Sequence, residues 1–285
     1  MPHKPTVMYE GANAFKQNTP KSRSPNSLPK PHPLGATPRA RYDTRLTDMG
    51  MQGLGYIMGG GFPTNSVYML MGQTGSYYQA FAQQALYNMV RTDVKVVYYT
   101  VESTAEDIQQ DMATFKWDVN EYLDNGSWIF TRLVPPQLKT IANKSPDDPR
   151  EQVMDLPPNS LTALEQDFTE RLKEGRWSAL SLAYLLNVYP EQEVTDLVMY
   201  WVNAAHTMGG IHFIMLPEGT HDEAHLNYLK SIVDGVLTFK FAQGFEQAEG
   251  EIEIQKLRRV IPKVKVVRHA IQDDGIAIET SARVG

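Results

Sequence analysis

Positions 67–79 read Val67-Tyr-Met-Leu-Met-Gly-Gln-Thr-Gly-Ser-Tyr-Tyr-Gln79, and this stretch decides the fold. Apolar residues run up to the first glycine, which is typical of a short buried strand. A second glycine follows three positions later, so the strand is predicted to end in a tight loop. A helix is expected next, from Ala80 to Val90. A buried strand that enters a helix through a glycine loop favours an α/β protein with a mainly parallel sheet.

The loop itself is similar to a phosphate-binding loop, whose pattern is G-x-x-x-x-G-K-[ST]. In that pattern the glycines let backbone N–H groups face a phosphate, the lysine neutralises it, and the hydroxyl holds Mg²⁺. Counted from Gly72, the second glycine falls on Tyr77, the lysine on Tyr78 and the Ser/Thr on Gln79. The strand, loop and helix are kept, whereas the cation and the metal ligand are not. The stretch predicts the fold of a nucleotide hydrolase without the hydrolysis.

Composition narrows the class of protein. The chain has 285 residues and no cysteine, which excludes disulfides, thiolate catalysis and zinc–thiolate sites. With 42% apolar residues it can bury a sizeable core. No apolar run approaches the roughly 18 residues that cross a bilayer, and the N-terminus lacks the apolar core of a signal peptide. We therefore expect a soluble cytoplasmic protein without membrane insertion.

Charge is distributed unevenly along the chain. Residues 1–45 hold eight Lys and Arg, two acids and eight prolines, a net charge of +6 that leaves −12 for the remainder of a chain with −6 overall. This composition predicts a Pro-rich, basic, disordered arm. An acidic body does not suit a nucleic-acid-binding domain, so we expect contact with nucleic acid only through the arm. The arm also suits an acidic membrane surface or an acidic partner.

From residue 46 to 285 the pattern predicts a single α/β domain. Strands alternate with helices first, and a run of strands closes the chain, which favours a parallel central sheet extended by antiparallel hairpins. Residues 134–160 are rich in Pro, Asp, Asn and Lys and are predicted to be a loop insertion. The predicted C-terminal strands are Gly235–Phe241, Glu251–Leu257, Lys263–His269 and Gly275–Glu279.

An ordered series of short phrases resembles the KaiC-type branch of the RecA-like ATPases, and within it the archaellum-associated FlaH (ArlH) group. The resemblance covers everything after the arm. The phrases that carry it are Thr47–Ser66, Val97–Thr104, Phe115–Val119, Ser231–Leu237, Lys256–Arg258 and Asp274–Ile276. The resemblance implies a RecA-like fold in which the loop after Gly72 and Gly75 belongs to the nucleotide site.

The positions at which this chain departs from the family pattern predict the function of the chain. The loop lysine and the metal-binding residue are replaced by Tyr78 and Gln79. Of the paired glutamates that activate water in the family, Glu102 remains beside Ser103, and Leu180 stands where the Walker B aspartate belongs. Phosphoryl transfer depends on positioning and on neutralised charge. We expect no enzyme activity: Glu102 is vestigial, no residue is catalytic, and no cofactor or metal is required.

Two functions remain open at this point. The first is a catalytically inactive subunit with a structural or regulatory role in an oligomeric assembly. The alternative is a sensor that binds ATP weakly, without efficient hydrolysis, through the degenerate loop at Gly72, Gly75, Tyr77, Tyr78 and Gln79. The resemblance links either function to an archaellum motor or to signalling. His221 and His225 are four apart, but the pattern is not that of a zinc helix, and we expect a solvated helix start there.

Lys256 and Arg258 are candidate interface residues. In active relatives the matching pair reaches the nucleotide site of the adjacent subunit in a ring, and alternate positions on a strand point the same way. Here we expect the pair to meet acidic groups, such as Glu102 of a neighbour, or to form an exposed basic strand face. The expected partner is a second copy, in a hexamer, or an active KaiC-like paralogue.

Overall fold

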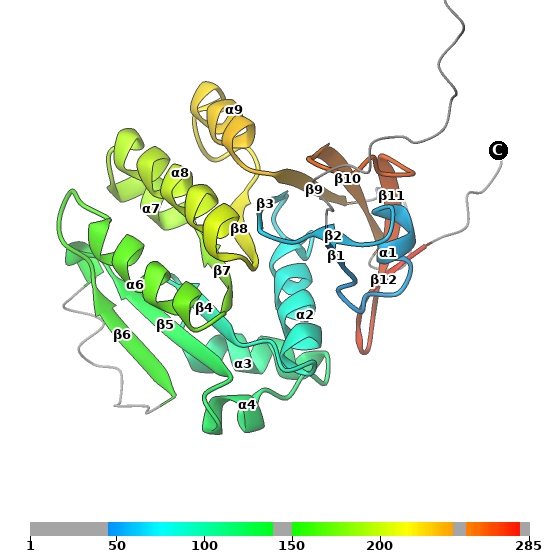
Figure 1. Ribbon diagram of the computed structural model, residues 1–285, viewed down its shortest axis with the longest axis horizontal. Coiled ribbons are helices and arrows are strands. Elements are labelled where there is room, and N and C mark those ends of the chain that lie inside the picture. Colours follow the sequence, from blue (N-terminus) through cyan, green and yellow to red (C-terminus); the bar gives the residue numbers. More distant parts are fainter. Residues whose placement is uncertain (1–44, 139–149, 242–248, 280–285) are drawn as a thin grey trace, which may run out of the picture. The chain divides into compact units, whose positions relative to one another are not determined.

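A ten-stranded sheet organises the part of the chain described by the computed structural model, which is residues 45–138, 150–241 and 249–279 (Figure 1). The strand order is β12-β11-β10-β9-β3-β8-β7-β4-β5-β6. The strands are β3 (Ser66–Gly72), β4 (Val96–Thr100), β5 (Trp128–Val134), β6 (Glu151–Asp155), β7 (Trp177–Ser181), β8 (Ile211–Pro217), β9 (Gly235–Phe241), β10 (Glu249–Leu257), β11 (Val266–Gln272) and β12 (Gly275–Ile278). A separate pair is formed by β1 (Leu46–Thr47) and β2 (Phe62–Pro63).

The helices lie between these strands in the chain. They are α1 (Leu54–Ile57), α2 (Tyr78–Val90), α3 (Ala105–Thr114), α4 (Asn120–Asp124), the 3₁₀ turn η1 (Pro136–Leu138), α6 (Thr162–Lys173), α7 (Ala183–Val188), α8 (Glu191–Met208) and α9 (Glu223–Ile232). None of the described helices is long and apolar enough to cross a membrane.

The predicted fold class is confirmed. Strands β9, β3, β8, β7, β4, β5 and β6 run parallel, and β10, β11 and β12 extend one edge as antiparallel hairpins. Where the described residues include the whole connection, parallel strands are joined through helices, and β11 is joined to β12 by a short turn, because only antiparallel neighbours can be joined in that way.

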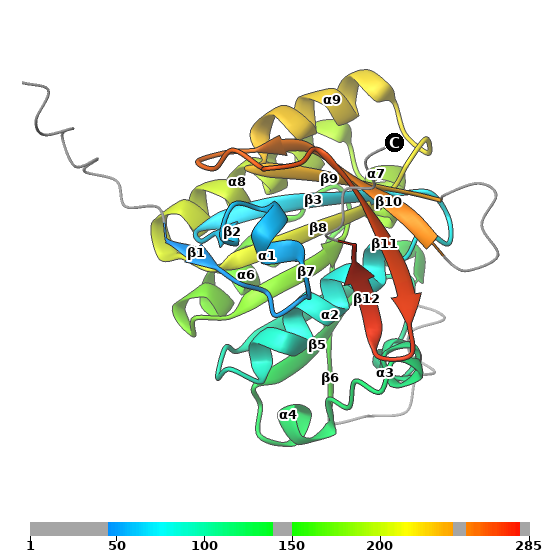
Figure 2. The ribbon, with the colours of Figure 1, turned by 90° about the vertical axis from the view of Figure 1, so that its right-hand side faces the viewer.

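Both faces of the parallel sheet are covered (Figure 2). Along β3 the side chains alternate: Tyr68 and Leu70 pack with α2, while Val67, Met69 and Met71 pack with α6 and α8. All seven residues of β3 are buried, since a strand in the middle of a two-sided sheet meets apolar partners on each face. The loop that leaves β3 is therefore held on a rigid support.

Two predicted boundaries need correction. The predicted loop at 134–160 contains β6, which pairs with the edge of the sheet; its side chains are mostly half-buried or exposed, so it lacks the apolar alternation of an inner strand. The strand predicted from Lys263 begins only at Val266. Residues 1–44 and 139–149 lie outside the described residues. They include the arm predicted over 1–45, except for Arg45, and the middle of the predicted insertion.

Candidate functional site

A cavity of about 810 Å³ lies where the parallel strands end. Four adjacent strands in the order β3-β8-β7-β4 bring their carboxyl ends to it, through Gly75, Pro217, Ser181 and Thr100. Helix α3 and the turn between β11 and β12 close its sides. Open parallel sheets generally bind their ligands at this edge, in the crevice outside the carboxyl ends of the strands. The cavity is therefore the candidate functional site.

The degenerate loop forms one wall of this cavity. Gly75, Tyr77, Tyr78 and Gln79 all line it, as the sequence predicted for a site on this loop. Tyr77 has a φ of 62°, in the left-handed region that favours glycine. This is the position that the phosphate-binding pattern assigns to its second glycine. The backbone has thus kept the glycine conformation although the residue has become tyrosine.

Gly72 has a different role from its neighbours in the loop. It does not line the cavity; instead a Cβ atom at Gly72 would lie 2.5 Å from Cδ1 of Tyr78 and would also clash with Oγ of Ser76. The missing side chain makes room for the tyrosine that stands in the position of the lysine. Glycine is required at residue 72 by packing.

Tyr78 lies deep in the cavity wall. Its side chain is only 8% exposed, and burial, with a smaller effect from Glu102, raises the pKa of its hydroxyl to about 12. No residue in the described ranges forms a hydrogen bond with this hydroxyl. It is therefore a neutral polar group, without a protein partner, at the surface of the cavity.

Glu102 ties two strand ends together. Its Oε1 accepts hydrogen bonds from Oγ of Ser181 at 3.3 Å and from the backbone N–H of Tyr184 at 3.1 Å. These bonds join the end of β4 to the beginning of α7 at the rim of the cavity. The prediction that Glu102 is a vestige of a general base is compatible with this structural role. Leu180, at the position of the missing aspartate, is fully buried and packs in the apolar layer beneath α8.

Three carboxylates line the cavity: Glu102, Asp111 and Asp273. Among the described residues that line it there is no lysine, arginine or histidine. Burial raises the pKa of the Tyr98 hydroxyl, a hydrogen bond with Gln83 offsets part of the rise, and the charges of Glu102 and Asp111 raise it further. The electrostatics of the cavity are thus opposite to those of a phosphate site, which needs cations.

Aromatic rings provide part of the remaining wall. They belong to Tyr77, Tyr78, Tyr98 and Phe115, whereas Tyr99 turns its ring to the other face of the sheet, against Trp201. The ring of Tyr77 meets Phe115 edge-on, with 6.4 Å between the centroids, and Phe115 stacks on Trp117 at 4.7 Å. The cavity is therefore aromatic and acidic together.

The candidate interface residues lie at the other edge of the sheet. Nζ of Lys256 donates to the carbonyl oxygens of Lys230 and Ser231 at 3.0 and 2.7 Å, and so caps the end of α9. The strand geometry expected for the pair is wrong, because a bulge interrupts β10 between Ile254 and Lys256 and the strand ends at Leu257. Arg258 lies beyond the strand, with half of its side chain exposed.

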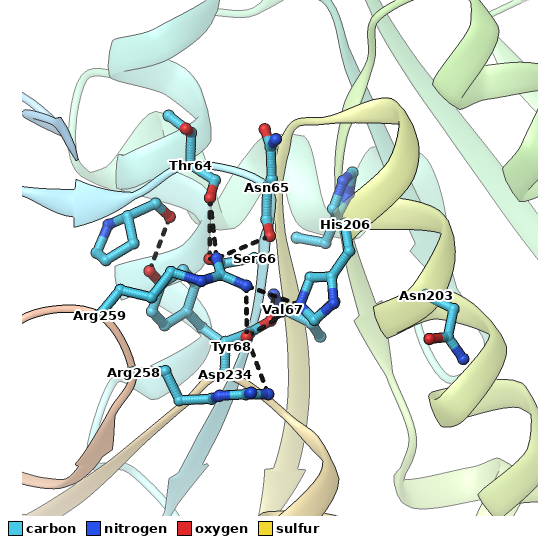
Figure 3. Close-up of polar contacts among 12 residues, drawn as sticks. Thr64, Asn65, Ser66, Val67, Tyr68, Asn203, His206, Asp234, Arg258 and Arg259 are labelled. Carbon is cyan, nitrogen blue, oxygen red and sulfur yellow. Dashed lines mark hydrogen bonds and ion pairs between the residues drawn. The ribbon is translucent and has the colours of Figure 1, made fainter. Parts of the chain in front are cut away.

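Arg258 belongs to a charge cluster around Asp234 (Figure 3). Asp234 is buried and accepts a hydrogen bond from the backbone N–H of Val67 at 3.1 Å. His206 approaches its carboxylate at 2.9 Å, the guanidinium of Arg259 at 3.2 Å, and that of Arg258 at 3.6 Å. The cluster holds the beginning of β3 against β9 and α8.

Several of these residues were not predicted from the sequence. Gln83 lines the cavity and was detectable, because it lies one helical turn after Gln79 and shares its face of α2. Asp111 and Asp273 carried no local signal, since acids on exposed helices and turns are common. Asp234 lay inside a phrase quoted for the resemblance, but the sequence did not indicate its partners.

The fold and the cavity define the class: a RecA-like α/β domain with a strand–loop–helix site at the carboxyl edge of its sheet. The family model of the KaiC ATPases matches residues 47–283. The chain belongs to the KaiC ATPase family.

Individual relatives agree with this assignment. The circadian clock oscillator protein KaiC of Parathermosynechococcus lividus is 25% identical over 236 residues, which are 80% of this chain and 41% of that protein. A UPF0273 protein of Pyrococcus horikoshii is 34% identical over 83 residues, 29% of this chain and 34% of that protein. The chain thus matches less than half the length of these relatives.

A solved structure shows the same fold. A KaiC-like protein of Pyrococcus horikoshii superposes with a TM-score of 0.64 at 18% identity, covering 83% of this chain and all of that one. The narrower assignment to the FlaH (ArlH) group remains a prediction from the sequence.

Proposed function

We propose that this KaiC-family chain has lost ATP hydrolysis and acts as a structural or regulatory subunit of an oligomeric assembly. The observation that carries the proposal is the lining of the cavity, which has three carboxylates and, among the described residues, no cationic side chain. A nucleotide triphosphate brings several negative charges, which the acidic wall repels. Stabilising the charge that develops in the transition state is usually the largest contribution to catalysis. Among the described residues that line this cavity, no cationic side chain supplies that stabilisation.

Two further observations support the loss of hydrolysis. The buried ring of Tyr78 occupies the position of the loop lysine and packs directly on Gly72. Leu180 occupies the position of the Walker B acid and faces the apolar core. Removing a single group of this kind typically reduces the rate by about 10²- to 10³-fold, so the combined changes leave turnover at background.

The experiment is a steady-state assay of purified protein with Mg²⁺ and ATP, run beside an active KaiC-family ATPase. We expect phosphate release at the level of the buffer control, unchanged by Glu102→Gln. Turnover that disappears in Glu102→Gln contradicts the proposal. A calorimetric titration separates the sensor alternative: micromolar ATP binding that is abolished by Gly75→Trp favours the sensor, and no binding favours the inactive subunit.

Assembly follows from where the charges lie. Within one copy, Arg258 and the acidic cavity are at opposite ends of β3, whose seven residues span roughly 20 Å. Contact between the two therefore needs a second copy, placed head to tail, and such an interface closes into a ring or pairs with a paralogue of the same fold. Lys256 donates two hydrogen bonds to its own α9, whereas Arg258 has only a 3.6 Å ion pair with Asp234 and a half-exposed side chain, so Arg258 is the residue that we assign to the contact. Light scattering at micromolar concentration tests this, and a strictly monomeric protein, alone or with an active relative, contradicts it.

A further inference from the structure

The cavity is shaped and lined for a ligand larger than a metal ion. Its volume of about 810 Å³ lies within the range of small-molecule sites, and four aromatic residues, Tyr77, Tyr78, Tyr98 and Phe115, line it from the side of α2 and α3. Within the described residues no group of three or more potential metal ligands occurs. Aromatic faces do not ligate hard cations, but they attract organic ones through the negative charge of the ring face.

The charged groups among the described residues that line the cavity are all carboxylates, which accept hydrogen bonds. Glu102 uses one carboxylate oxygen for Ser181 and Tyr184, and no bond within the described residues uses the other. The carboxylate of Asp111, on α3, faces the same cavity and likewise accepts no bond from a described residue. Asp273 is different, because it pairs with the exposed Lys116 at 3.7 Å. Two carboxylates are thus available to a ligand that donates.

The Tyr78 hydroxyl is an independent indication of a ligand. Its side chain is more than nine-tenths buried, it lines the cavity, and it has no hydrogen-bond partner among the described residues. The buried ring leaves this oxygen at the surface of the cavity, where a donor group of a ligand can reach it without displacing a protein partner. A bound donor group would satisfy this oxygen together with the two carboxylates.

We propose that the cavity binds an organic cation, an alkylammonium or alkylguanidinium group, between Glu102, Asp111 and the aromatic rings. The proposal rests on the loss of the nucleotide from this site and names the class of ligand that replaces it. The cation is desolvated by the rings, donates to the carboxylates, and reaches the Tyr78 hydroxyl. Two sources fit this chemistry, namely a free small molecule and an arginine or lysine side chain from a second copy of the chain.

The test is calorimetry on the full chain, without nucleotide or magnesium. The probe is Nα-acetyl-L-arginine amide, called arginine amide below, and the matched control is Nα-acetyl-L-citrulline amide, which has the same shape and a hydrogen-bonding side chain but carries no charge. We expect arginine amide to bind at least about tenfold more tightly, with the difference shrinking as salt is raised, because partly exposed charges are screened. Equal affinity for the two probes, or no binding of either, overturns the proposal.

Three variants locate the site. Asp111→Asn is expected to weaken arginine amide by about two- to fivefold, the usual size of a partly exposed ion pair. Glu106→Gln, on the same helix but outside the lining, leaves the affinity unchanged. Tyr78→Phe weakens binding while leaving the melting temperature unchanged or higher, because it removes a hydroxyl that the protein itself does not satisfy. An affinity that none of the lining variants changes overturns the proposal.

Sedimentation distinguishes the two sources. If arginine amide dissociates an assembly of the purified protein, a side chain of a second copy supplies the cation. If it binds without changing the sedimentation coefficient, the ligand is a free small molecule. Failure here is distinct from failure of the proposed function: ATP turnover would contradict the inactive subunit whatever the cation result, and absent cation binding would leave the turnover assay untouched.

Discussion

The two ends of strand β3 treat buried polar groups in opposite ways. At its beginning, the carboxylate of Asp234 meets a backbone N–H, His206, Arg259 and Arg258. At its end, Oγ of Ser76 and Nδ1 of His269 are buried without a hydrogen-bond partner in the described residues. The Tyr78 hydroxyl, at the cavity surface, has no partner among them either. We call the beginning of β3 the closed end, because its buried polar groups are paired, and the end of β3 beside the cavity the open end, because its polar groups lack partners in the described residues.

This difference separates stability from function. A buried charge is tolerated when it is paired and hydrogen-bonded, so the Asp234 cluster acts as a clamp on the fold. Unpaired groups next to a cavity do not stabilise the chain alone, and they are expected where a ligand completes the site. Family resemblance alone does not reveal the contrast between paired and unpaired polar groups, because it assigns both ends of the strand to one nucleotide-binding domain.

Breaking the clamp should have the largest effect on stability. We expect Asp234→Asn to lower the free energy of unfolding by about 3 kcal/mol, because the guanidinium groups of Arg258 and Arg259 lose their common counter-charge while the Asn oxygen still accepts from Val67. Urea unfolding measures the change. The affinity for arginine amide should change less than twofold in the folded variant, since the cavity lies at the other edge.

The surface pair Lys240–Glu253 provides a matched control for the clamp. Its atoms lie 2.8 Å apart, but both side chains are about a third exposed or more. Such pairs contribute about 0–1 kcal/mol, so Glu253→Gln should unfold close to the wild type. Equal costs for Asp234→Asn and Glu253→Gln would show that burial of Asp234 does not make it a clamp.

Two buried histidines give a second, pH-dependent comparison of the two ends. Burial lowers the pKa of His269 and that of His212 from 6.5 to about 4. Below pH 6.5 the unfolded chain takes up a proton that the folded chain refuses, so stability falls as the pH is lowered from 6.5 to 4. Each histidine contributes about 1.4 kcal/mol per pH unit to this loss. Substitution by Gln at either position should reduce the slope by that amount in urea titrations across the window.

The histidines differ above the window, where both are neutral. His212 lies at the amino edge and uses both ring nitrogens, Nδ1 with Ser178 at 2.9 Å and Nε2 with the carbonyl oxygen of Gly209 at 3.1 Å. His269 leaves Nδ1 unsatisfied. At pH 8 His212→Gln should therefore cost about 1–2 kcal/mol more than His269→Gln, owing to the lost hydrogen bonds. A reversed order would contradict the contrast between the ends.

Local signals in the sequence were sufficient for the loop and for the first turn of α3. Counting from Gly72 placed Tyr77 at the glycine position, and its left-handed backbone agrees. Thr104 caps α3 through a reciprocal bond with Asp107, and this Thr-x-x-Asp spacing is visible in the sequence. These features depend on neighbours within a few residues, so a single sequence reveals them.

Long-range partners were beyond the sequence. The bond from Val67 to Asp234 joins residues 167 positions apart. Asp111 reaches the cavity only because α3 packs beside the strand ends, and its own neighbourhood is that of any solvated helix. The fold was predictable because apolar periodicity is local, whereas the charge balance of the cavity depends on which distant side chains the fold brings together.

The smallest expected change in the free energy of unfolding concerns the left-handed backbone of Tyr77, in the loop after β3. Tyr77 holds a left-handed conformation that costs a non-glycine residue about 1 kcal/mol. Tyr77→Gly removes this strain, but it also adds about 0.5–1 kcal/mol of chain entropy in the unfolded state and loses the edge-on contact with Phe115. We expect the free energy of unfolding to stay within about 0.5 kcal/mol of the wild type, whereas Tyr77→Val, with a branched Cβ, should lose about 1–2 kcal/mol.

In calorimetry both variants should bind arginine amide about twofold more weakly, because each removes one ring from the cavity. A loss above about 2 kcal/mol in Tyr77→Gly would mean that the Tyr77 ring, and not the backbone, holds the loop. The Tyr77 ring would then stabilise the fold, as the Asp234 cluster does at the beginning of β3. The part of the loop that serves the cavity alone would then begin only after residue 77.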